Sequence, residues 1–236
     1  MSRKIKLGKD PYDYGFDLYK KRSVTIKSGL TVLVGCNGSG KSTFLNCIKD
    51  TLKKEDILYM EFNNLRDGGY YAKGESLRMG DLSFLASQAS GSEGENITLN
   101  IARFSGNICE FIKTGTYRTD KNMLVKIFRR AANEKTEEEN EKEPSNERWF
   151  LFDAIDSGLS IDNVIELKEY LFKQIFDNSD GKEVYIVVSA NEYEMANGEQ
   201  CFDVMEGKYI AFKNYDEYKQ MILNSRTKKE ERYKVT

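Results

Sequence analysis

The sequence predicts an α/β fold with a mostly parallel sheet at its core and a smaller helical lobe. Residues 23–34 change from alternating to continuously apolar, as in strands that enter a buried sheet, and a glycine-rich turn follows at Gly35. Apolar residues then recur at helical spacing from Phe44 to Leu52, and residues 56–62 have the pattern of another strand. Strand, loop, helix and strand in this order indicate parallel pairing.

The second half of the chain predicts further strands of the same sheet. Residues 149–152 form a short apolar strand that ends at Asp153, residues 164–176 have helical spacing, and residues 184–188 are mostly β-branched. We therefore expect one domain over residues 1–236, whose core lobe combines about 1–62 with about 149–236.

The middle of the chain predicts a separate helical lobe over about 63–132. Several glycines are followed there by helical periodicity over residues 97–112. An acidic run over about 133–148 has almost no apolar side chain to bury, so we expect a mobile surface connection. The charged residues 225–236 predict a helix end or a loose tail.

Composition excludes several classes of function. The 36 Lys and Arg nearly balance the 38 Asp and Glu, and a formal charge of −2 provides no general attraction for nucleic acid or anionic lipid. The four cysteines lack paired spacings, and no apolar stretch reaches the roughly 20 residues of a membrane span. We expect a cytoplasmic protein with reduced thiols and no membrane span. Histidine is absent, so chemistry must use carboxylates, hydroxyls, amides, lysine or a metal.

Residues 35–43 read G-C-N-G-S-G-K-S-T and match the phosphate-binding P-loop between a strand and a helix. Glycines allow successive backbone N–H groups to face a phosphate, and the following helix adds the positive end of its dipole. The predicted nucleotide-binding residues here are Gly35, Asn37, Gly38, Ser39, Gly40, Lys41, Ser42 and Thr43. In this motif Lys41 bridges the β- and γ-phosphates.

Two residues predict a Mg²⁺ site beside that loop. Ser42 offers a hydroxyl, and Asp153 ends an apolar strand where such proteins hold the metal. Mg²⁺ prefers oxygen ligands in octahedral geometry. ATP with Mg²⁺ is therefore the predicted ligand.

The motifs together resemble those of the ATP-binding-cassette (ABC) class. The loop carries Asn37, residues 153–160 (D-A-I-D-S-G-L-S) resemble the Walker B and D-loop run, and residues 92–95 (S-E-G-E) resemble the signature of the SMC/RecF-like branch. The chain is similar to short "AAA family" ATPases of phages and bacteria that have no coiled coil. The resemblance implies one ABC-type nucleotide-binding domain.

The resemblance also implies an ATP-dependent head-to-tail homodimer. In the family, two subunits enclose two ATP molecules, and signature residues of one subunit touch the γ-phosphate held by the other. Ser92 and Gly94 would have that part here. Ser92 and the glutamates near it are also ordinary helix-capping residues, so a capping loop is the alternative.

The sequence departs from the family at two catalytic positions. Ala154 stands where a glutamate polarises the attacking water, and Asn191 stands where a histidine contacts the γ-phosphate. We predict that Asp156 places the water, with Lys41 and Asn191 as the other catalytic residues; a turn carboxylate is the alternative for Asp156. Asn191 can donate a hydrogen bond but cannot take a proton.

Three further resemblances and clusters are less specific. Asn63 and Asn64 follow a predicted strand where the family places a water-binding glutamine. Tyr12, Tyr14 and Phe16 are candidates to stack on adenine, as an aromatic residue ahead of the first core strand does in many relatives, although packing is the better explanation for any single one of them. The short basic clusters, at 20–22, 129–130 and 228–229, are typical of solvated faces.

These observations predict a Mg²⁺-dependent ATPase, slow because of Ala154, that acts on DNA or a partner protein. Loss of a water-positioning group typically costs about 10²- to 10⁴-fold in rate. Two alternatives remain open at this point: a nucleotide-gated binding module with little or no hydrolysis, and the ATPase subunit of a transporter.

Overall fold

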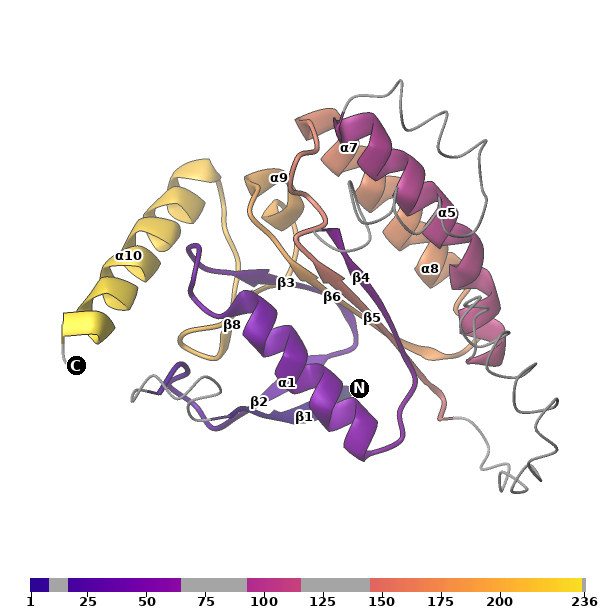
Figure 1. Ribbon diagram of the computed structural model, residues 1–236, viewed down its shortest axis with the longest axis horizontal. Helices are drawn as coiled ribbons and strands as arrows, with labels where there is room; N and C mark the ends of the chain where they lie inside the picture. Colours follow the sequence, from indigo (N-terminus) through magenta and orange to yellow (C-terminus); the bar gives the residue numbers. More distant parts are fainter. Residues whose placement is uncertain (9–16, 65–92, 116–144, 235–236) are drawn as a thin grey trace, which may run out of the picture.

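The computed structural model describes residues 1–8, 17–64, 93–115 and 145–234 (Figure 1). Within these ranges a six-stranded sheet has the order β4-β5-β6-β3-β7-β8. Neighbouring strands pair in parallel from β4 to β7, and β8 pairs with β7 in the antiparallel direction. The strands are β3 (Gly29–Val34), β4 (Tyr59–Asn63), β5 (Glu147–Asp153), β6 (Glu183–Ser189), β7 (Cys201–Asp203) and β8 (Lys208–Ile210).

A second, two-stranded sheet packs near the N-terminus of the chain. It consists of β1 (Ser2–Lys6) and β2 (Ser23–Lys27), which pair antiparallel. Ile5 and Ile26 are fully buried, while the neighbouring Lys4 and Lys27 are exposed. This alternation is the pattern of a sheet with one buried and one solvated face.

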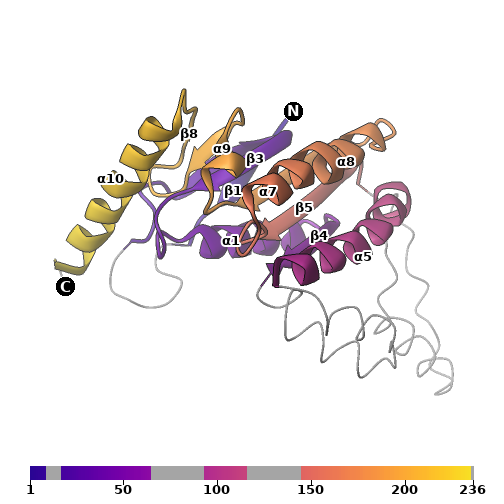
Figure 2. The same ribbon diagram turned by 90° about the horizontal axis from the view of Figure 1, so that it is seen from above.

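Helices cover both faces of the central sheet (Figure 2). The helix α1 (Lys41–Lys54) lies on one face, and α5 (Glu93–Thr114) lies on the other with the helical segment formed by α7 (Ile161–Glu166), the π-helical turn η1 (Leu167–Phe172) and α8 (Lys173–Asp177). The short α9 (Tyr193–Ala196) follows β6, and α10 (Tyr215–Lys234) ends the described chain beside the sheet (Figure 1).

Consecutive residues of each central strand enter two different hydrophobic cores. Val32 and Phe150 belong to the core under α5, α7 and α8, whereas Leu33 and Trp149 belong to the core under α1. All four are fully buried, and burial of a side chain of this size contributes about 1.5–3 kcal/mol. The predicted α/β fold with a mostly parallel sheet is therefore confirmed.

The predicted elements are present, with shifted ends. The strand expected at 149–152 extends over Glu147–Asp153, and the helix expected at 164–176 spans residues 161–177 with a π-helical turn inside it. Of the two alternatives for the residues from 225 onward, a helix end or a loose tail, the structure shows the helix end, because these residues belong to the 20-residue helix α10. Among the described side chains of α10, only those of Tyr218 and Ser225 are buried. A helix with so few buried residues needs few apolar ones, so its sequence resembles that of a solvated tail.

Most of the predicted helical lobe and acidic connection lies outside the described residues, so this division of the chain stays a prediction. The described part is α5, and its C-terminal half packs on the central sheet through Ile108, Phe111 and Ile112. The ring of Phe111 meets the ring of Phe150 edge to face, with centroids 5.4 Å apart. The periodicity of residues 97–112 therefore reflects, at least in this half, a core-facing helix.

Two further expectations concern cysteines and membranes. Cys36, Cys47, Cys109 and Cys201 are all free thiols. Among the described helices, none combines the length and the apolar character needed to cross a membrane.

Candidate functional site

The polar residues of the site come together at one edge of the central sheet. The parallel strands β3, β4, β5 and β6 all end there, because parallel strands place their carboxyl ends at a common edge. The P-loop follows β3, Asn63 ends β4, Asp153 ends β5 and Ser189 ends β6. Residues far apart in the sequence therefore face the start of α1.

The loop between β3 and α1 has a backbone that requires glycine. Gly40 has φ 100°, and a β-carbon at this residue would lie 2.9 Å from Cδ2 of Leu18. A β-carbon at Gly35 would lie 2.5 Å from the hydroxyl oxygen of Ser39. The Ser39 hydroxyl is buried and is one of the described side-chain groups that have no hydrogen-bond partner. The loop is thus folded as tightly as a phosphate-binding loop requires.

Lys41 lies folded into this loop at the first position of α1. Its Nζ donates to the carbonyl oxygens of Gly35, at 2.8 Å, and Cys36, at 3.5 Å. Burial lowers the pKa of Lys41, since removal from water disfavours the charged ammonium. A polyphosphate beside Lys41 would offset that cost, as expected for a cation placed to bind an anion.

The carboxylate of Asp153 is the centre of a network of three side chains. Ser42 and Ser189 donate their hydroxyls to Oδ1 at 3.1 Å and 2.6 Å, and Asn63 donates its amide to Oδ2 at 3.1 Å. The Ser189 hydroxyl oxygen also accepts the backbone N–H of Ala154 at 2.7 Å. The network fixes both oxygens of the carboxylate at the edge of the phosphate loop.

This arrangement fits a Mg²⁺ ion held by few protein ligands. Ligands in adjacent positions of an octahedral Mg²⁺ lie about 3 Å apart, which is close to the 3.1 Å between Ser42 Oγ and Asp153 Oδ1. No group of three or more metal-ligating Asp, Glu, Cys or His side chains occurs in the described ranges. That is the usual situation for Mg²⁺ sites completed by water and substrate phosphates.

Asp156 is fully buried, in a position that sequence reasoning did not anticipate. Its Oδ2 accepts the backbone N–H groups of Asn191 at 2.7 Å and Glu192 at 2.8 Å, so it holds the turn that follows β6. Its Oδ1 has no hydrogen-bond partner. Burial raises the pKa of Asp156. The geometry gives Asp156 a structural contact, and its predicted role toward water stays a prediction.

Asn191 lies beside Ser157, which belongs to the turn that follows β5. Its Nδ2 donates to the Ser157 hydroxyl at 2.9 Å, and its own carbonyl oxygen accepts the hydroxyl of Tyr218 at 3.0 Å. Asn64, predicted near a water site, donates to the carbonyl oxygen of Ser157 at 2.7 Å. The structure therefore brings Asn191 to the end of β6, with its amide held toward the Ser157 turn.

Several predicted site residues cannot be placed. Ser92 and the aromatic candidates Tyr12, Tyr14 and Phe16 lie outside the described residues. Gly94 falls in the first turn of α5, where only the helical backbone is described. Thr43 is buried in α1. The site as described therefore consists of the P-loop, Asp153, Asp156 and Asn191 with their neighbours.

Other residues of the site have no signal in the sequence. Tyr19 is buried, donates its hydroxyl to the Gly40 carbonyl oxygen at 2.8 Å and packs edge to face on Phe44. Ser225 and Lys229 of α10 contact the loop from about 190 positions away. Only the tertiary structure brings these residues to the loop.

A cavity of about 560 Å³ opens between the loop and α10. Gly35, Cys36 and Asn37 of the loop border it, together with Asn191. Its size is within the range of small-molecule sites.

Comparison with known proteins gives structural similarities only. The chain matches no model of a known protein family, and no curated protein matches it. Among solved structures, it is similar to a nucleotide-free ATP-binding cassette of an ABC transporter (16% identity, TM-score 0.42, 95% of this chain and 96% of that chain). It is also similar to a cassette of an ABC transporter in its ADP conformation (16% identity, TM-score 0.43, 96% and 98%). At these values the similarity is not informative about activity.

Proposed function

We propose that this chain binds ATP with Mg²⁺ and hydrolyses the nucleotide slowly. The observation that carries the proposal is the convergence of the glycine-dependent loop, the buried Lys41 and the Ser42–Asp153 pair at one sheet edge. Loop N–H groups and the start of α1 bind the phosphates, and Lys41 contacts the β- and γ-phosphates. Bound Mg²⁺ neutralises charge on those phosphates.

Titration of the chain with ATP by calorimetry tests this proposal. We expect saturable binding in Mg²⁺ and affinity lower by about tenfold or more in EDTA, because Ser42 and Asp153 contribute only through the metal. Asp153→Asn should remove most of the Mg²⁺ dependence, whereas Asp177→Asn, at an exposed carboxylate of α8, should retain it. Absence of binding heat at millimolar ATP would contradict the proposal.

Ala154 supports a second candidate, a nucleotide-gated binding module. The residue after Asp153 has no carboxylate, and the nearby Asp156 is buried with one oxygen occupied by backbone N–H groups. Such a module would bind ATP as above and hydrolyse it at a rate near the background. The Asp156 variant described in the Discussion separates the two candidates.

The proposal includes an ATP-dependent homodimer of the SMC/RecF-like kind, in which Ser92 of one copy meets the nucleotide of the other. We expect light scattering to report a doubled mass when a slowly hydrolysed ATP analogue and Mg²⁺ are added. Ser92→Arg should prevent the increase while ATP binding by the monomer is retained, and Ser179→Arg, at a half-buried residue after α8, serves as the control. An unchanged mass for the parent protein would contradict the dimer.

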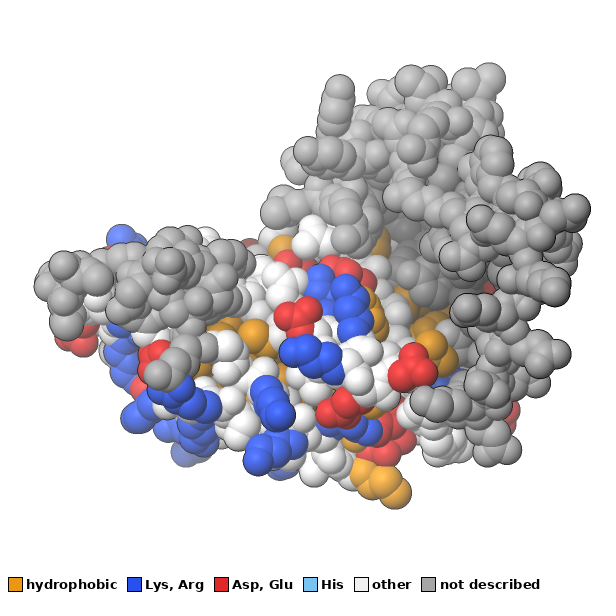
Figure 3. Space-filling view, turned by 60° about the horizontal axis from the view of Figure 1, so that its bottom comes forward, with side chains coloured by type: hydrophobic (Ala, Val, Ile, Leu, Met, Phe, Trp, Pro, Cys, Tyr) orange, Lys and Arg blue, Asp and Glu red, His pale blue; other side chains and the backbone are white. Residues whose placement is uncertain are grey.

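A partner of the proposed ATPase, DNA or protein, has limited support in the described surface. Two residues of the basic cluster at 20–22 pair with carboxylates, Lys20 with Glu206 at 3.0 Å and Arg22 with Asp17 at 3.5 Å, and Lys21 donates to the Gly207 carbonyl oxygen. Figure 3 shows Lys and Arg gathered at the lower left of one face, with Asp and Glu interspersed over the rest. Binding of short duplex DNA by the parent protein with ATP, measured by fluorescence anisotropy at two salt concentrations, tests the DNA alternative.

A further inference from the structure

The helix α10 lies against the phosphate loop, although the two are distant in the sequence. Figure 1 shows the loop between β3 and α1 turned toward α10. Ser225 accepts the backbone N–H of Cys36 at 3.1 Å, and Lys229 donates its ammonium to the Asn37 carbonyl oxygen at 2.9 Å. One helix therefore touches two consecutive residues of the loop.

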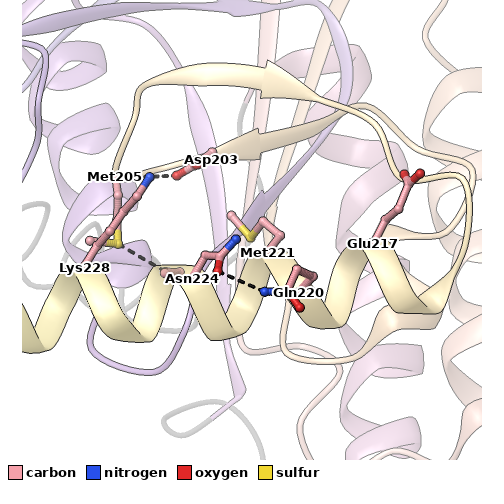
Figure 4. Close-up of a pocket in the computed structure, with 8 residues that line it drawn as sticks. Asp203, Met205, Glu217, Gln220, Met221, Asn224 and Lys228 are labelled. Atoms are coloured by element: carbon pink, nitrogen blue, oxygen red, sulfur yellow. Dashed lines mark hydrogen bonds between the residues drawn. The ribbon is translucent and has the colours of Figure 1, made fainter.

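The position of α10 is fixed by contacts along its length. Tyr218 donates to the Asn191 carbonyl oxygen at 3.0 Å, and the buried Ser225 donates its hydroxyl to the sulfur of Met205 at 3.1 Å. Figure 4 shows Met205 beside α10. Lys228 pairs at 2.7 Å with Glu206, which also binds Lys20. These two cations lower the pKa of Glu206 to about 2, so it stays ionised at neutral pH. The helix is thus held in its first turn by Tyr218, in its middle by Ser225 and in its C-terminal half by Lys228.

The cavity between α10 and the loop carries more positive than negative charge. Lys219, Arg226 and Lys229 line it on the helix side, against the two carboxylates Glu192 and Glu230. Glu230 already pairs with Arg226 at 2.9 Å in an exposed contact of the kind worth less than about 1 kcal/mol. Turning the Arg226 side chain from Glu230 toward an anion would therefore require little free energy.

We propose that Lys229 contacts the terminal phosphate of a nucleoside triphosphate bound in the same chain, with Arg226 as a second cation. The proposal rests on the proposed ATP site and adds to it a cation from α10. Asn191, which the family resemblance predicts to contact the terminal phosphate, borders the same cavity as Lys229 and Asn37. A cation delivered to the γ-phosphate from the same chain stabilises the charge that phosphoryl transfer develops.

The contacts of Lys229 show why a phosphate would attract it. Its ammonium donates to a neutral carbonyl oxygen, that of Asn37, and a bond to an anionic phosphate oxygen is roughly twice as strong. Its stem lies along the loop, since a β-carbon at Gly38 would be 3.5 Å from both Cδ and Nζ of Lys229. A lysine has several rotatable bonds, so the ammonium can turn from Asn37 into the cavity that Lys229 lines without movement of the helix.

Comparison of ATP and ADP affinities tests this inference. Lys229→Met keeps the length of the stem and removes the charge. We expect it to weaken Mg²⁺-ATP binding by about tenfold or more, the usual effect of losing a hydrogen bond to a charged group, and ADP binding by less than about threefold. Lys229→Arg should restore most of the preference for ATP. The control is Lys173→Met, at an exposed lysine of α8 that does not line the cavity, and it should bind both nucleotides like the parent protein.

Each outcome has a distinct meaning. If the parent protein binds neither nucleotide, the proposed function fails. If the parent binds ATP and Lys229→Met binds ATP and ADP with parental affinities, only the role of Lys229 is overturned. Tighter ATP binding by Lys229→Met would also overturn it and would make α10 a cover that competes with the nucleotide. Equal thermal midpoints for parent and variant exclude misfolding as the cause of weaker binding.

Discussion

Lys41→Ala is expected to weaken ATP binding by about 100-fold or more. The Lys41 ammonium is buried against the Gly35 and Cys36 carbonyl oxygens at the N-terminus of α1, where it would contact two phosphates. Loss of each charge-assisted bond costs about 1.5–3 kcal/mol, which for two bonds corresponds to at least two orders of magnitude in Kd. Calorimetric titration with Mg²⁺-ATP measures the change.

The control for Lys41→Ala is Lys54→Ala, which removes an exposed lysine from the last turn of the same helix. This variant should bind ATP like the parent protein. Circular dichroism of Lys41→Ala should report the parental helix content, because the alanine that replaces Lys41 is a good helix former. Parental ATP affinity in folded Lys41→Ala would refute the assignment of the loop.

Asp156→Asn is expected to lower turnover by about tenfold or more while ATP affinity is retained. No histidine exists in the chain, Ala154 has no proton acceptor, and Asp153 is engaged with Ser42 and Ser189. Oδ1 of Asp156 has no hydrogen-bond partner and is the remaining carboxylate oxygen in this turn. A fall in kcat without a change in Kd identifies a group used mainly in the transition state. Phosphate-release assays provide the rate.

The buried position of Asp156 requires a second readout. Its Oδ2 holds the backbone of Asn191 and Glu192, so Asp156→Asn should also lower the thermal midpoint, since bonds to charged groups are stronger than bonds to an amide. A water-positioning carboxylate must be ionised, and burial raises the pKa of Asp156. Turnover of the parent should therefore fall on acidification at a higher pH than an exposed aspartate would cause. If Asp156 has only a structural role, Asp156→Asn should have the same kcat as the parent protein and the same dependence of kcat on pH.

If Asp156→Asn and the parent turn over equally, the module candidate is favoured. Ala154→Glu then becomes the informative variant, because it places a carboxylate directly after Asp153. The backbone at Ala154 has φ 52°, and alanine already carries the β-carbon that is strained there, so glutamate adds little further cost. Ala154→Gln is the matched control without charge. A faster rate for Ala154→Glu alone would identify the missing carboxylate as the limit on hydrolysis.

The sequence by itself determined the features that depend on local conformation. Gly35, Gly38 and Gly40 are spaced for a loop whose backbone few other residues can adopt, and the apolar runs on either side specify buried parallel strands. Asp153 was predictable because it ends such a strand. The role of Ser92 was predicted from motif resemblance alone, and it stays a prediction because Ser92 lies outside the described residues.

Only the tertiary structure decided which distant residues complete the site. Ser189 and Asn63 reach Asp153 because β6, β5 and β4 are adjacent in the sheet, an order that the chain sequence does not reveal. Lys229 reaches Asn37 across 192 positions, from a helix whose polar sequence resembles a solvated tail. Such contacts depend on the pairing of elements after folding, and a single pair of polar residues leaves no periodic pattern in the sequence. The burial of Asp156 was likewise decided by packing, since a turn carboxylate and a catalytic one have the same local sequence.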